Sequence, residues 1–511
     1  MAKTGVDLIS TADIARLADQ SRATVGNWKA RNPDFPPERG RGPRGPLYDR
    51  GEVTQWLQST GRLDKQPPEV SAMWHVVGLL RGHMATEDAL PLVLVLLAVM
   101  ALADTAPWRE IVQARPEELD ATIRSAVFPL FPFADELVPR RPLPAEPVAR
   151  VIAALSNLDQ PRIWLMAGAL PEHAAKTMGH RGGEYLSPPS VRRLVVAIAE
   201  LVGSVYNPVE SVYIPGSGIG QLMIDVAVRG GRGDLELTGQ EINPRIWAMA
   251  QLNLAIEGVH ADIALGDVFT DDRFPQLRAD RVVAIPQWNQ KLPVLDRMNG
   301  DPRWVWGEPG PNDVSAAWIQ HCLYHLAESG RAVVVLPNAA LFEGGRAGRI
   351  RQRIIKAGLL DAVVALPPGL FAWTNLPCAV LVFVKGRGSA DGKPAPTLMV
   401  DIRDPAEGRT AHPAHPALGD ALIGEVTRIC RGWAAGEEPT SENAAVAHFD
   451  DLAANDFVID PARYVSVPYP APDLEEAVQK RAALLDHLDR LTQASRDADD
   501  QLRAILGCGD D

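Results

Sequence analysis

The chain has 511 residues, 46% of them hydrophobic, so it is long enough to bury cores in roughly two to four domains. Its formal net charge of −13 opposes non-specific binding to DNA and restricts any contact with nucleic acid to a locally basic region. The cysteines (Cys322, Cys378, Cys430 and Cys508) lie far apart and form no CxxC pair. This argues against a disulfide framework or a zinc site and fits a reducing cytoplasm, and no metal site is expected. The polar N-terminus does not resemble a signal peptide.

Changes in composition and hydrophobic spacing predict the order of the domains. Residues 65–69 (KQPPE) are typical of a linker. The predicted segments are a basic head at 1–62, a helical domain at 70–175, an α/β core at 176–390, a C-terminal extension of that core at 391–470 and a charged helix at 471–511.

The first 62 residues hold ten Lys and Arg against seven Asp and Glu, a local excess of +3. A first helix is expected to begin near Thr11, and a second to run from Arg22 to Lys29 with Val25 and Trp28 on its inner face. A loop rich in Gly, Pro and Arg follows, and a third helix closes the unit. This order resembles a winged helix-turn-helix of the excisionase/MerR kind.

That resemblance implies contact with double-stranded DNA, because in such folds the second helix enters the major groove and the wing touches phosphates. The alternative is a small helical protein-interaction domain with a flexible basic loop. The residues expected to face DNA are Ser21, Arg22, Thr24, Asn27 and Lys29 from the turn and second helix, and Arg39, Arg41 and Arg44 from the loop.

The longest apolar stretch, Ala89 to Ala103, has 15 residues and contains Pro91. A membrane-spanning helix needs about 20. The stretch therefore predicts a buried helix, and no membrane partner is expected.

From residue 176 onward, short apolar strands alternate with helical stretches, which is typical of an α/β sheet. A strand at 211–214 runs into the turn Pro215-Gly216-Ser217-Gly218-Ile219-Gly220, and a helix follows. Glycines there let the backbone approach a ligand closely, although many strand–helix turns need glycine for packing only.

Acidic residues follow the next two predicted strands. Glu241 comes after the strand at 235–239, where a carboxylate can accept both hydroxyls of a ribose. Asp267 comes after the strand at 263–265 and is placed to bind an adenine amino group. Taken singly, each acid is explained as well by a strand end or a helix cap. A fourth strand, at 281–284, ends in the run Ile285-Pro286-Gln287-Trp288.

These ordered runs resemble the modification subunits of type I restriction systems, which are adenine-N6 DNA methyltransferases. That family carries runs like GEFYTP, VYDPACGSGG, GQEIN, GD and ANPPF in this order. The corresponding runs here are GEYLSP (183–188), VYIPGSGIG (212–220), GQEIN (239–243), GD (266–267) and AIPQW (284–288). The similarity extends over roughly residues 70–465.

The resemblance implies an α/β fold: a Rossmann-like, S-adenosylmethionine-dependent methyltransferase sheet preceded by a helical domain and the winged helix-turn-helix head. It implies S-adenosylmethionine as cofactor and DNA as substrate. The glycines would lie near the methionine part, Glu241 at the ribose and Asp267 at the adenine. The cofactor site would be lined by Tyr185, Pro188, Ile214, Pro215, Gly216, Gly218, Gly220, Glu241 and Asp267.

The first departure from the family pattern is at Ile285, where relatives have the Asn of Asn-Pro-Pro-Phe/Tyr. In the family, that tetrapeptide holds a flipped-out adenine: the Asn oxygen accepts from the amino group and the aromatic ring stacks on the base. Isoleucine offers no acceptor, so the catalytic run Ile285, Pro286, Gln287 and Trp288 is expected to be impaired. Gln287 or Asn289 is the alternative source of an acceptor.

The second departure is at Ile214, where the family has an Asp that contacts the amino group of the cofactor. Isoleucine removes this charge-assisted partner and is expected to weaken cofactor binding. The alternative interpretation is that Ile214 merely continues a buried strand.

The last segment has an apolar stripe on a charged helix from Leu474 to Leu506. Two interpretations remain: a helix that contacts a specificity-type subunit or a second copy of the chain, or one that folds back on its own domain. For the whole chain the hypotheses are a DNA-binding pseudoenzyme with a regulatory or assembly role, an active adenine-N6 methyltransferase and, with least support, a small-molecule methyltransferase.

Overall fold

A computed structural model describes most of the chain. The described residues are 8–17, 22–32, 34–42, 45–49, 52–53, 56–57, 60, 74–102, 105–158, 163, 166, 170, 186–199, 209–231, 235–288, 291–292, 300–371, 373–386, 393–403, 409–410, 417–465, 481, 485–486, 488–490 and 492–493. The predicted linker at 65–69 lies outside them.

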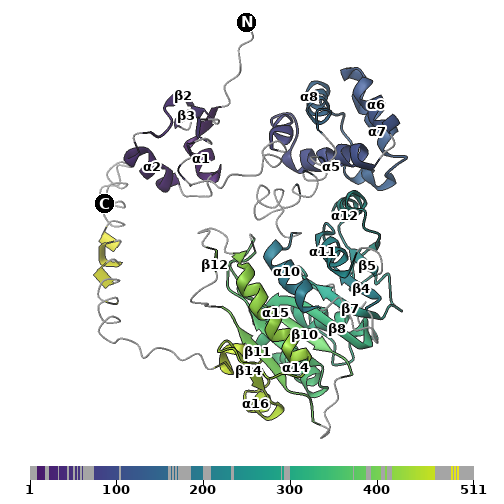
Figure 1. Ribbon diagram of the computed structural model, residues 1–511, viewed down its shortest axis with the longest axis vertical. Coiled ribbons are helices and arrows are strands. Elements are labelled where there is room, and N and C mark those ends of the chain that lie inside the picture. The colour runs from purple at the N-terminus through teal and green to yellow at the C-terminus, as the bar shows by residue number, and fades with distance from the viewer. Residues whose placement is uncertain are drawn as a thin grey trace, which may run out of the picture. The chain divides into compact units, whose positions relative to one another are not determined.

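The head, residues 8–60, combines helices with a three-stranded antiparallel sheet of order β1-β3-β2 (Figure 1). Residues 52–53 and 56–57 are also helical. A small core of Ile14, Val25, Tyr48, Val53 and Leu57 holds these parts together. The elements are β1 (Leu8–Ser10), α1 (Thr11–Leu17), α2 (Arg22–Arg31), β2 (Glu38–Gly42) and β3 (Gly45–Asp49).

The basic segment after α2 is not the loop that composition predicts. Arg39 and Arg41 lie in strand β2, which pairs with β3 as a hairpin. The pairing is possible because Gly45 adopts a φ of 120°, a conformation that other residues rarely adopt. The predicted loop is therefore wrong for these two residues, while Arg44 lies outside the described residues.

A helical region follows the head and encloses its own apolar core. The apolar stretch at 89–103 forms most of α5, and Leu92 to Val99 are fully buried, which confirms the predicted buried helix. Among the described residues no helix is both long and apolar enough to cross a membrane. The elements are α5 (Thr86–Leu102), α6 (Thr105–Gln113), η1 (Pro116–Glu118), α7 (Leu119–Val127), η2 (Pro132–Glu136) and α8 (Ala145–Leu155).

A nine-stranded sheet forms the centre of the chain, in the order β14-β11-β9-β10-β8-β7-β4-β5-β6. Pairs along β6-β5-β4-β7-β8 are parallel, whereas β10 runs antiparallel to both of its neighbours. The strands are β4 (Ser211–Pro215), β5 (Glu236–Glu241), β6 (Asp262–Leu265), β7 (Ala279–Ala284), β8 (Leu326–Pro337), β9 (Leu360–Ala365), β10 (Cys378–Val384), β11 (Thr397–Asp401) and β14 (Ala444–Ala447).

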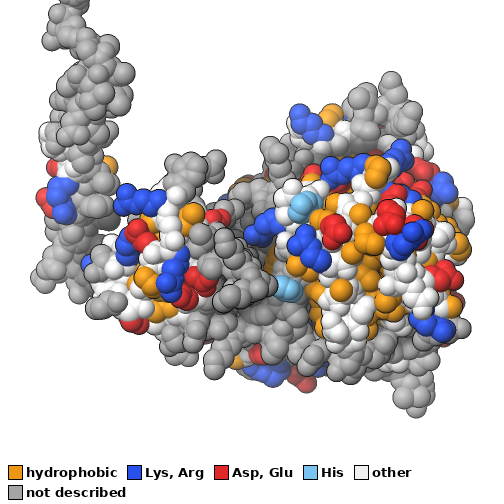
Figure 2. Space-filling view, turned by 90° about the horizontal axis from the view of Figure 1, so that it is seen from above, with side chains coloured by type: hydrophobic (Ala, Val, Ile, Leu, Met, Phe, Trp, Pro, Cys, Tyr) orange, Lys and Arg blue, Asp and Glu red, His pale blue; other side chains and the backbone are white. Residues whose placement is uncertain are grey.

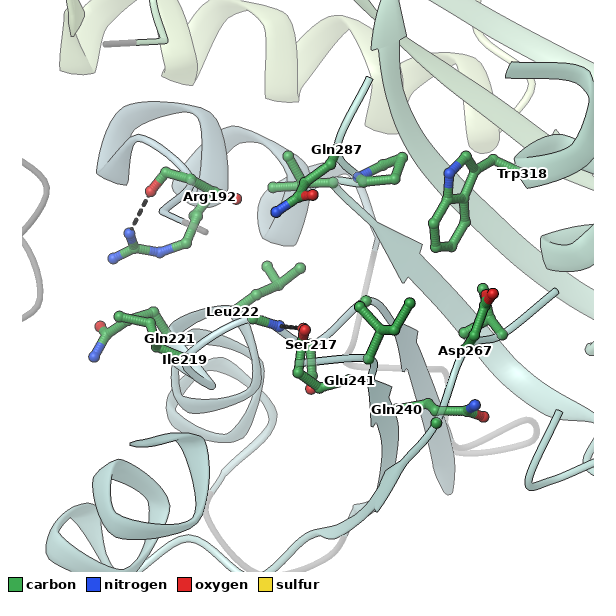
Figure 3. A pocket seen from close by; sticks show the side chains of 18 residues that line it. Arg192, Ser217, Ile219, Gln221, Leu222, Gln240, Glu241, Asp267, Gln287 and Trp318 are labelled. Atoms are coloured by element: carbon green, nitrogen blue, oxygen red, sulfur yellow. Dashed lines mark hydrogen bonds between the residues drawn. The ribbon is translucent and has the colours of Figure 1, made fainter. Parts of the chain in front are cut away.

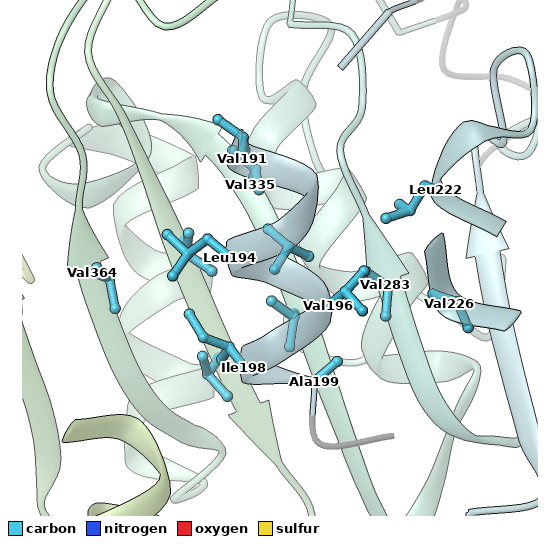
Figure 4. Packing of buried hydrophobic residues seen from close by; sticks show 14 of the residues in the cluster. Val191, Leu194, Val196, Ile198, Ala199, Leu222, Val226, Val283, Val335 and Val364 are labelled. Carbon is cyan, nitrogen blue, oxygen red and sulfur yellow. The ribbon is translucent and has the colours of Figure 1, made fainter. Parts of the chain in front are cut away.

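Helices cover both faces of this sheet, in agreement with the predicted α/β class. One core cluster joins the sheet to α10, α11, α12 and α15, and another joins its opposite face to α13, α14 and α16. Figure 4 shows α10 lying over the strands, with Leu194 and Ile198 among the valines of the sheet. The remaining elements are α10 (Pro189–Ile198), α11 (Gln221–Gly230), α12 (Pro244–Glu257), α13 (Val314–Tyr324), η6 (Asn338–Leu341), α14 (Gly345–Lys356), β12 (Arg409–Thr410), β13 (Ala417–Leu418), α15 (Asp420–Ala434), α16 (Phe449–Ala454) and η7 (Pro461–Arg463).

Helix α12 belongs to two cores at once. Ala250 and Leu254 pack with the sheet, whereas Met249 and Leu252 pack with the helical region. Arg245 at the start of α12 adds an ion pair at 3.0 Å to Asp88 of α5. The helical region and the sheet are thus joined through this helix.

The part of the chain from residue 466 onward forms a separate compact unit. Its described residues are helical and exposed, including Leu485 and Leu488, which are 50% and 59% exposed. Arg490 and Asp486 form an ion pair at 3.1 Å one helical turn apart.

Candidate functional site

A cavity that is open to solvent lies at the carboxyl ends of four parallel strands (Figure 3). From β4 the chain proceeds outward to β5 and β6 on one side, and β7 and β8 lie on the other. Open α/β sheets bind ligands where the strand order reverses in this way. The lining residues are Ser187, Arg192, Gly216, Ser217, Gly218, Ile219, Gln221, Leu222, Gln240, Glu241, Ile242, Gly266, Asp267, Val268, Ile285, Pro286, Gln287 and Trp318.

The turn after β4 forms one wall, and its glycines are required by its shape. Gly216, Gly218 and Gly220 have φ angles of 70°, 56° and 82°, in the left-handed region that favours glycine. A Cβ atom on Gly216 would lie 3.4 Å from the ring of Trp318. The amides of Gly216 and Ser217 donate to the carbonyl oxygen of Gln240, which fixes the turn against the end of β5.

Glu241 is buried at the end of β5, and both of its carboxylate oxygens accept backbone hydrogen bonds. Oε2 accepts from the amide of Gly218 at 3.0 Å, and Oε1 accepts from the amide of Asn243 at 2.9 Å. Burial raises the pKa of Glu241, and these backbone hydrogen bonds oppose the rise. Each oxygen has a further lone pair, so the carboxylate can also accept hydroxyl donors from a ligand.

Asp267 lies at one end of the cavity, beside Trp318 and on the side opposite Arg192 and Gln221 in Figure 3. Its carboxylate accepts from the amide of Phe269 at 2.9 Å and from the hydroxyl of Thr270 at 3.0 Å. The acid therefore caps a turn, as the structural interpretation of the sequence expects, and it also lines the cavity.

Of the four residues that follow β7, only the first three line the cavity. Ile285, Pro286 and Gln287 line the cavity, whereas Trp288 is not among its lining residues. The Trp288 ring packs against Phe371 and Trp373, with centroid distances of 4.8 and 5.0 Å, and its indole N–H donates to the carbonyl oxygen of Val335 at 3.3 Å.

The structure brings together seven of the predicted cofactor and catalytic residues on the cavity wall. Ile214 is fully buried in the core beneath α10 and α11, so it does not line the cavity. Pro188, Pro215 and Gly220 lie nearby in the chain but are not lining residues either. Tyr185 and Asn289 lie outside the described residues. The seven are Gly216, Gly218, Glu241, Asp267, Ile285, Pro286 and Gln287.

Six polar lining residues were not predicted from the sequence: Ser187, Arg192, Ser217, Gln221, Gln240 and Trp318. Arg192 is only 6% exposed, which is unusual for an arginine, and it comes from α10 rather than from a strand end. The sequence does not distinguish Arg192 from its neighbour Arg193, although Arg193 forms an ion pair with Asp420 and does not line the cavity.

A second polar cluster is buried on the opposite face of the sheet. Arg303 lies 3.1 Å from Nδ1 of His321, and Tyr213 Oη lies 3.2 Å from its Nε2. Because a guanidinium only donates, Nδ1 accepts and Nε2 carries the proton. The possible ligand atoms of Asp272, His321 and His325 lie within 4.8 Å of one another, but the adjacent Arg303 opposes a bound cation.

Comparison with known proteins adds a family match. Residues 169–470 match the family model described as N-6 DNA Methylase. The chain is 29% identical over 327 residues to the type I restriction enzyme HindI methylase subunit of Haemophilus influenzae, a match that covers 61% of this chain and 70% of that protein. It is also 29% identical over 304 residues to the MjaIX methylase subunit of Methanocaldococcus jannaschii, covering 57% of this chain but only 53% of that relative.

Solved structures share the fold. The type I restriction-modification methyltransferase subunit from Streptococcus thermophilus superposes with a TM-score of 0.60 at 20% identity, covering 78% of this chain and 99% of that one. A chain from a study of complex assembly in a type I R-M system gives a TM-score of 0.61 at 16% identity, covering 85% and 99%. At these identities the likeness concerns the fold alone.

Proposed function

This chain belongs to the N-6 DNA methylase family, and we propose that it is a DNA-bound member with an impaired methyl-transfer site and a regulatory or assembly role. The observation that carries the proposal is Ile285, a side chain without a hydrogen-bond acceptor on the wall of the cavity. The family resemblance puts the acceptor for the adenine amino group at this position.

The cavity fits S-adenosylmethionine, the cofactor that the family implies and that supplies a sulfonium methyl group when bound. Glu241 offers carboxylate lone pairs in the middle of the cavity, where a ribose would place its hydroxyls. Asp267 and Trp318 would hold the adenine, and the positive-φ glycines leave space for the methionine part. We therefore propose that cofactor binding survives.

Transfer to adenine is impaired in two ways. At Ile285 the amino group of a flipped base would meet carbon, leaving a donor unpaired at a cost of about 1–3 kcal/mol. Trp288, the ring expected to stack on that base, is already packed against Phe371 and Trp373. Trp288 is also absent from the cavity lining, so it is not positioned to stack on a base held there.

The second candidate function is an active adenine-N6 methyltransferase, and Gln287 favours it. This residue lines the cavity two positions after Ile285 and carries an amide oxygen. A base shifted toward Gln287 would find an acceptor there.

We propose that the head binds DNA through α2 and the hairpin of β2 and β3. Asn27 is exposed on α2 and Arg41 on β2. Lys29 and Arg39 are also exposed but form ion pairs with Glu38 and Glu52. On the face in Figure 2, basic and acidic side chains are interspersed over the described residues. The protein-interaction alternative for the head would not need Arg41.

The exposed leucines of the C-terminal unit make it the proposed contact for a specificity-type subunit or a second copy of the chain. Leu485 and Leu488 are both at least half exposed and lie on an otherwise charged helix. A helix that returns to its own domain remains the alternative. Contact with a second copy would make the purified protein oligomeric, whereas contact with a specificity-type subunit would appear only when the two proteins are mixed.

Calorimetry with S-adenosylmethionine, combined with transfer of a labelled methyl group to duplex DNA, tests the proposal. We expect cofactor binding and DNA retention without methyl transfer at the rate of active relatives. The Haemophilus influenzae relative, assayed under the same conditions with its own partner subunit, sets that rate. Methylation at a comparable rate would establish the active alternative instead.

A further inference from the structure

Arg192 is a buried cation at one end of the cavity. It lies beside Gln221 and Ile219 in Figure 3, on the side opposite Asp267 and Trp318, with Glu241 between them. Its side chain is 7% exposed. Burying a charge in this way is costly unless the group is paired.

Two protein partners hold the guanidinium without using all of its donors. Nε donates to the Asp225 carboxylate at 2.6 Å, and Nη1 donates to the carbonyl oxygen of Ser187 at 2.7 Å. A guanidinium has five N–H donors. Among the described residues no partner is recorded for Nη2, and the residue lines the cavity.

Among the lining residues that the structure describes, no acid at the same end of the cavity is placed to bind an amine. Ile214 is buried in the core, and Asp225 is already paired with Arg192. The acids on the lining, Glu241 and Asp267, lie in the middle and at the far end. The donors that remain at this end, on Nη2 of Arg192, therefore suit an anion.

We propose that Arg192 binds an oxyanion on the 5′ side of an adenosine ligand. This inference rests on the proposed function, because Glu241 and Asp267 orient the adenosine that carries the anion. The carboxylate of an adenosyl amino acid or a phosphate supplies the required chemistry, and arginine can bind either in a bidentate manner. Arg192 then determines which adenosine compounds the cavity accepts.

The test measures the affinities of the full chain for three ligands by calorimetry: S-adenosylhomocysteine with a carboxylate, 5′-methylthioadenosine with neither anion, and AMP with a phosphate. We expect the wild-type chain to bind one of the anionic ligands at least tenfold more tightly than methylthioadenosine. Arg192→Gln should remove that difference and leave methylthioadenosine binding within twofold, and Arg192→Lys should restore part of it. The matched control is Arg193→Gln, which alters an arginine paired with Asp420 outside the cavity lining.

The outcomes separate this inference from the proposed function. Tighter binding of AMP than of S-adenosylhomocysteine, lost in Arg192→Gln, supports the oxyanion site and identifies phosphate as its source. Equal losses for all three ligands show that Arg192 only ties α10 to α11, and overturn the inference. Equal affinities in the wild-type chain overturn it without any variant. If none of the three ligands nor S-adenosylmethionine binds, the proposed cofactor site fails as well.

Discussion

The amide of Gly218 donates to Oε2 of Glu241 at 3.0 Å, so the glycine-rich turn and the acid after the next strand form one unit. Glu241 also accepts from the amide of Asn243, which caps α12 through its own side chain. The acid therefore determines the shape of the cavity as well as its charge.

Replacing Glu241 with Gln should weaken both binding and stability. A glutamine amide nitrogen would face one of the two backbone amides that the carboxylate accepts, leaving a buried donor unpaired. We expect the free energy of unfolding to fall by about 1–3 kcal/mol and the affinity for S-adenosylmethionine to fall at least tenfold. Urea unfolding and calorimetry measure the two effects. Glu236→Gln, at the exposed start of the same strand, should change neither.

Replacing Ile285 with Asn should raise methyl transfer to DNA. The change adds an oxygen acceptor on the cavity wall at a partly buried position that tolerates a polar side chain. We expect at least a tenfold rise in labelled methyl incorporation. Ile285→Leu supplies no acceptor and is the control. An equal rise in both variants would contradict the role assigned to the missing acceptor.

Replacing Ile214 with Asp should destabilise the fold instead of restoring a cofactor contact. The side chain is fully buried among apolar neighbours, so the new carboxylate would have no partner. We expect a loss of more than about 3 kcal/mol in urea unfolding, whereas Ile214→Val should cost about 1 kcal/mol. A stable Asp variant with tighter cofactor binding would show instead that this position reaches the cavity.

Replacing Arg41 with Ala should weaken binding to duplex DNA of any sequence. Lys29 forms an ion pair with Glu38, and Arg39 forms one with Glu52. Arg41 is therefore expected to make a stronger contact with phosphate than either of these two residues. The slope of log affinity against log salt should fall by about 1 in fluorescence anisotropy. Arg349→Ala, on the exposed face of α14, is the matched control, and an unchanged slope in both variants would favour protein interaction by the head.

Stability should decrease as the pH falls below about 6.5, because His321 is neutral in the fold. Burial lowers the pKa of His321 well below its ordinary value, with His325 and Arg303 contributing. The unfolded chain therefore binds a proton that the folded chain does not. The contribution of neutral His321 to the free energy of unfolding is complete above about pH 6.5. Below that pH it is lost at up to about 1.4 kcal/mol per pH unit.

Urea unfolding at pH 8.0, 7.0, 6.0 and 5.5 measures this dependence. His321→Gln should be less stable at every pH but show a flatter profile, while His260→Gln, an exposed change, should keep the wild-type slope. A steeper profile in His321→Gln would assign the titration to another group.

The sequence predicts most of the cavity because parallel strands bring their carboxyl ends to one edge of a sheet. Glu241, Asp267 and Ile285 lie at or just after the ends of three different strands and meet for that reason. The orientation of Ile214 was not predictable, since Val212, Tyr213, Ile214 and Pro215 form an apolar run without alternation. Arg192 was missed because its burial depends on Asp225, 33 residues away on another helix.

Helix α12 has a consequence for how the molecule responds to its ligand. Its first turn is capped by Asn243, whose amide is held by Glu241 in the cavity, and its two faces pack into the sheet and into the helical region. A ligand that restricts the motion of Glu241 therefore also stabilises the first turn of α12, and the helical region packs against this helix. Occupancy of the cavity would therefore change local opening around α5, a helix that the bound small molecule does not touch.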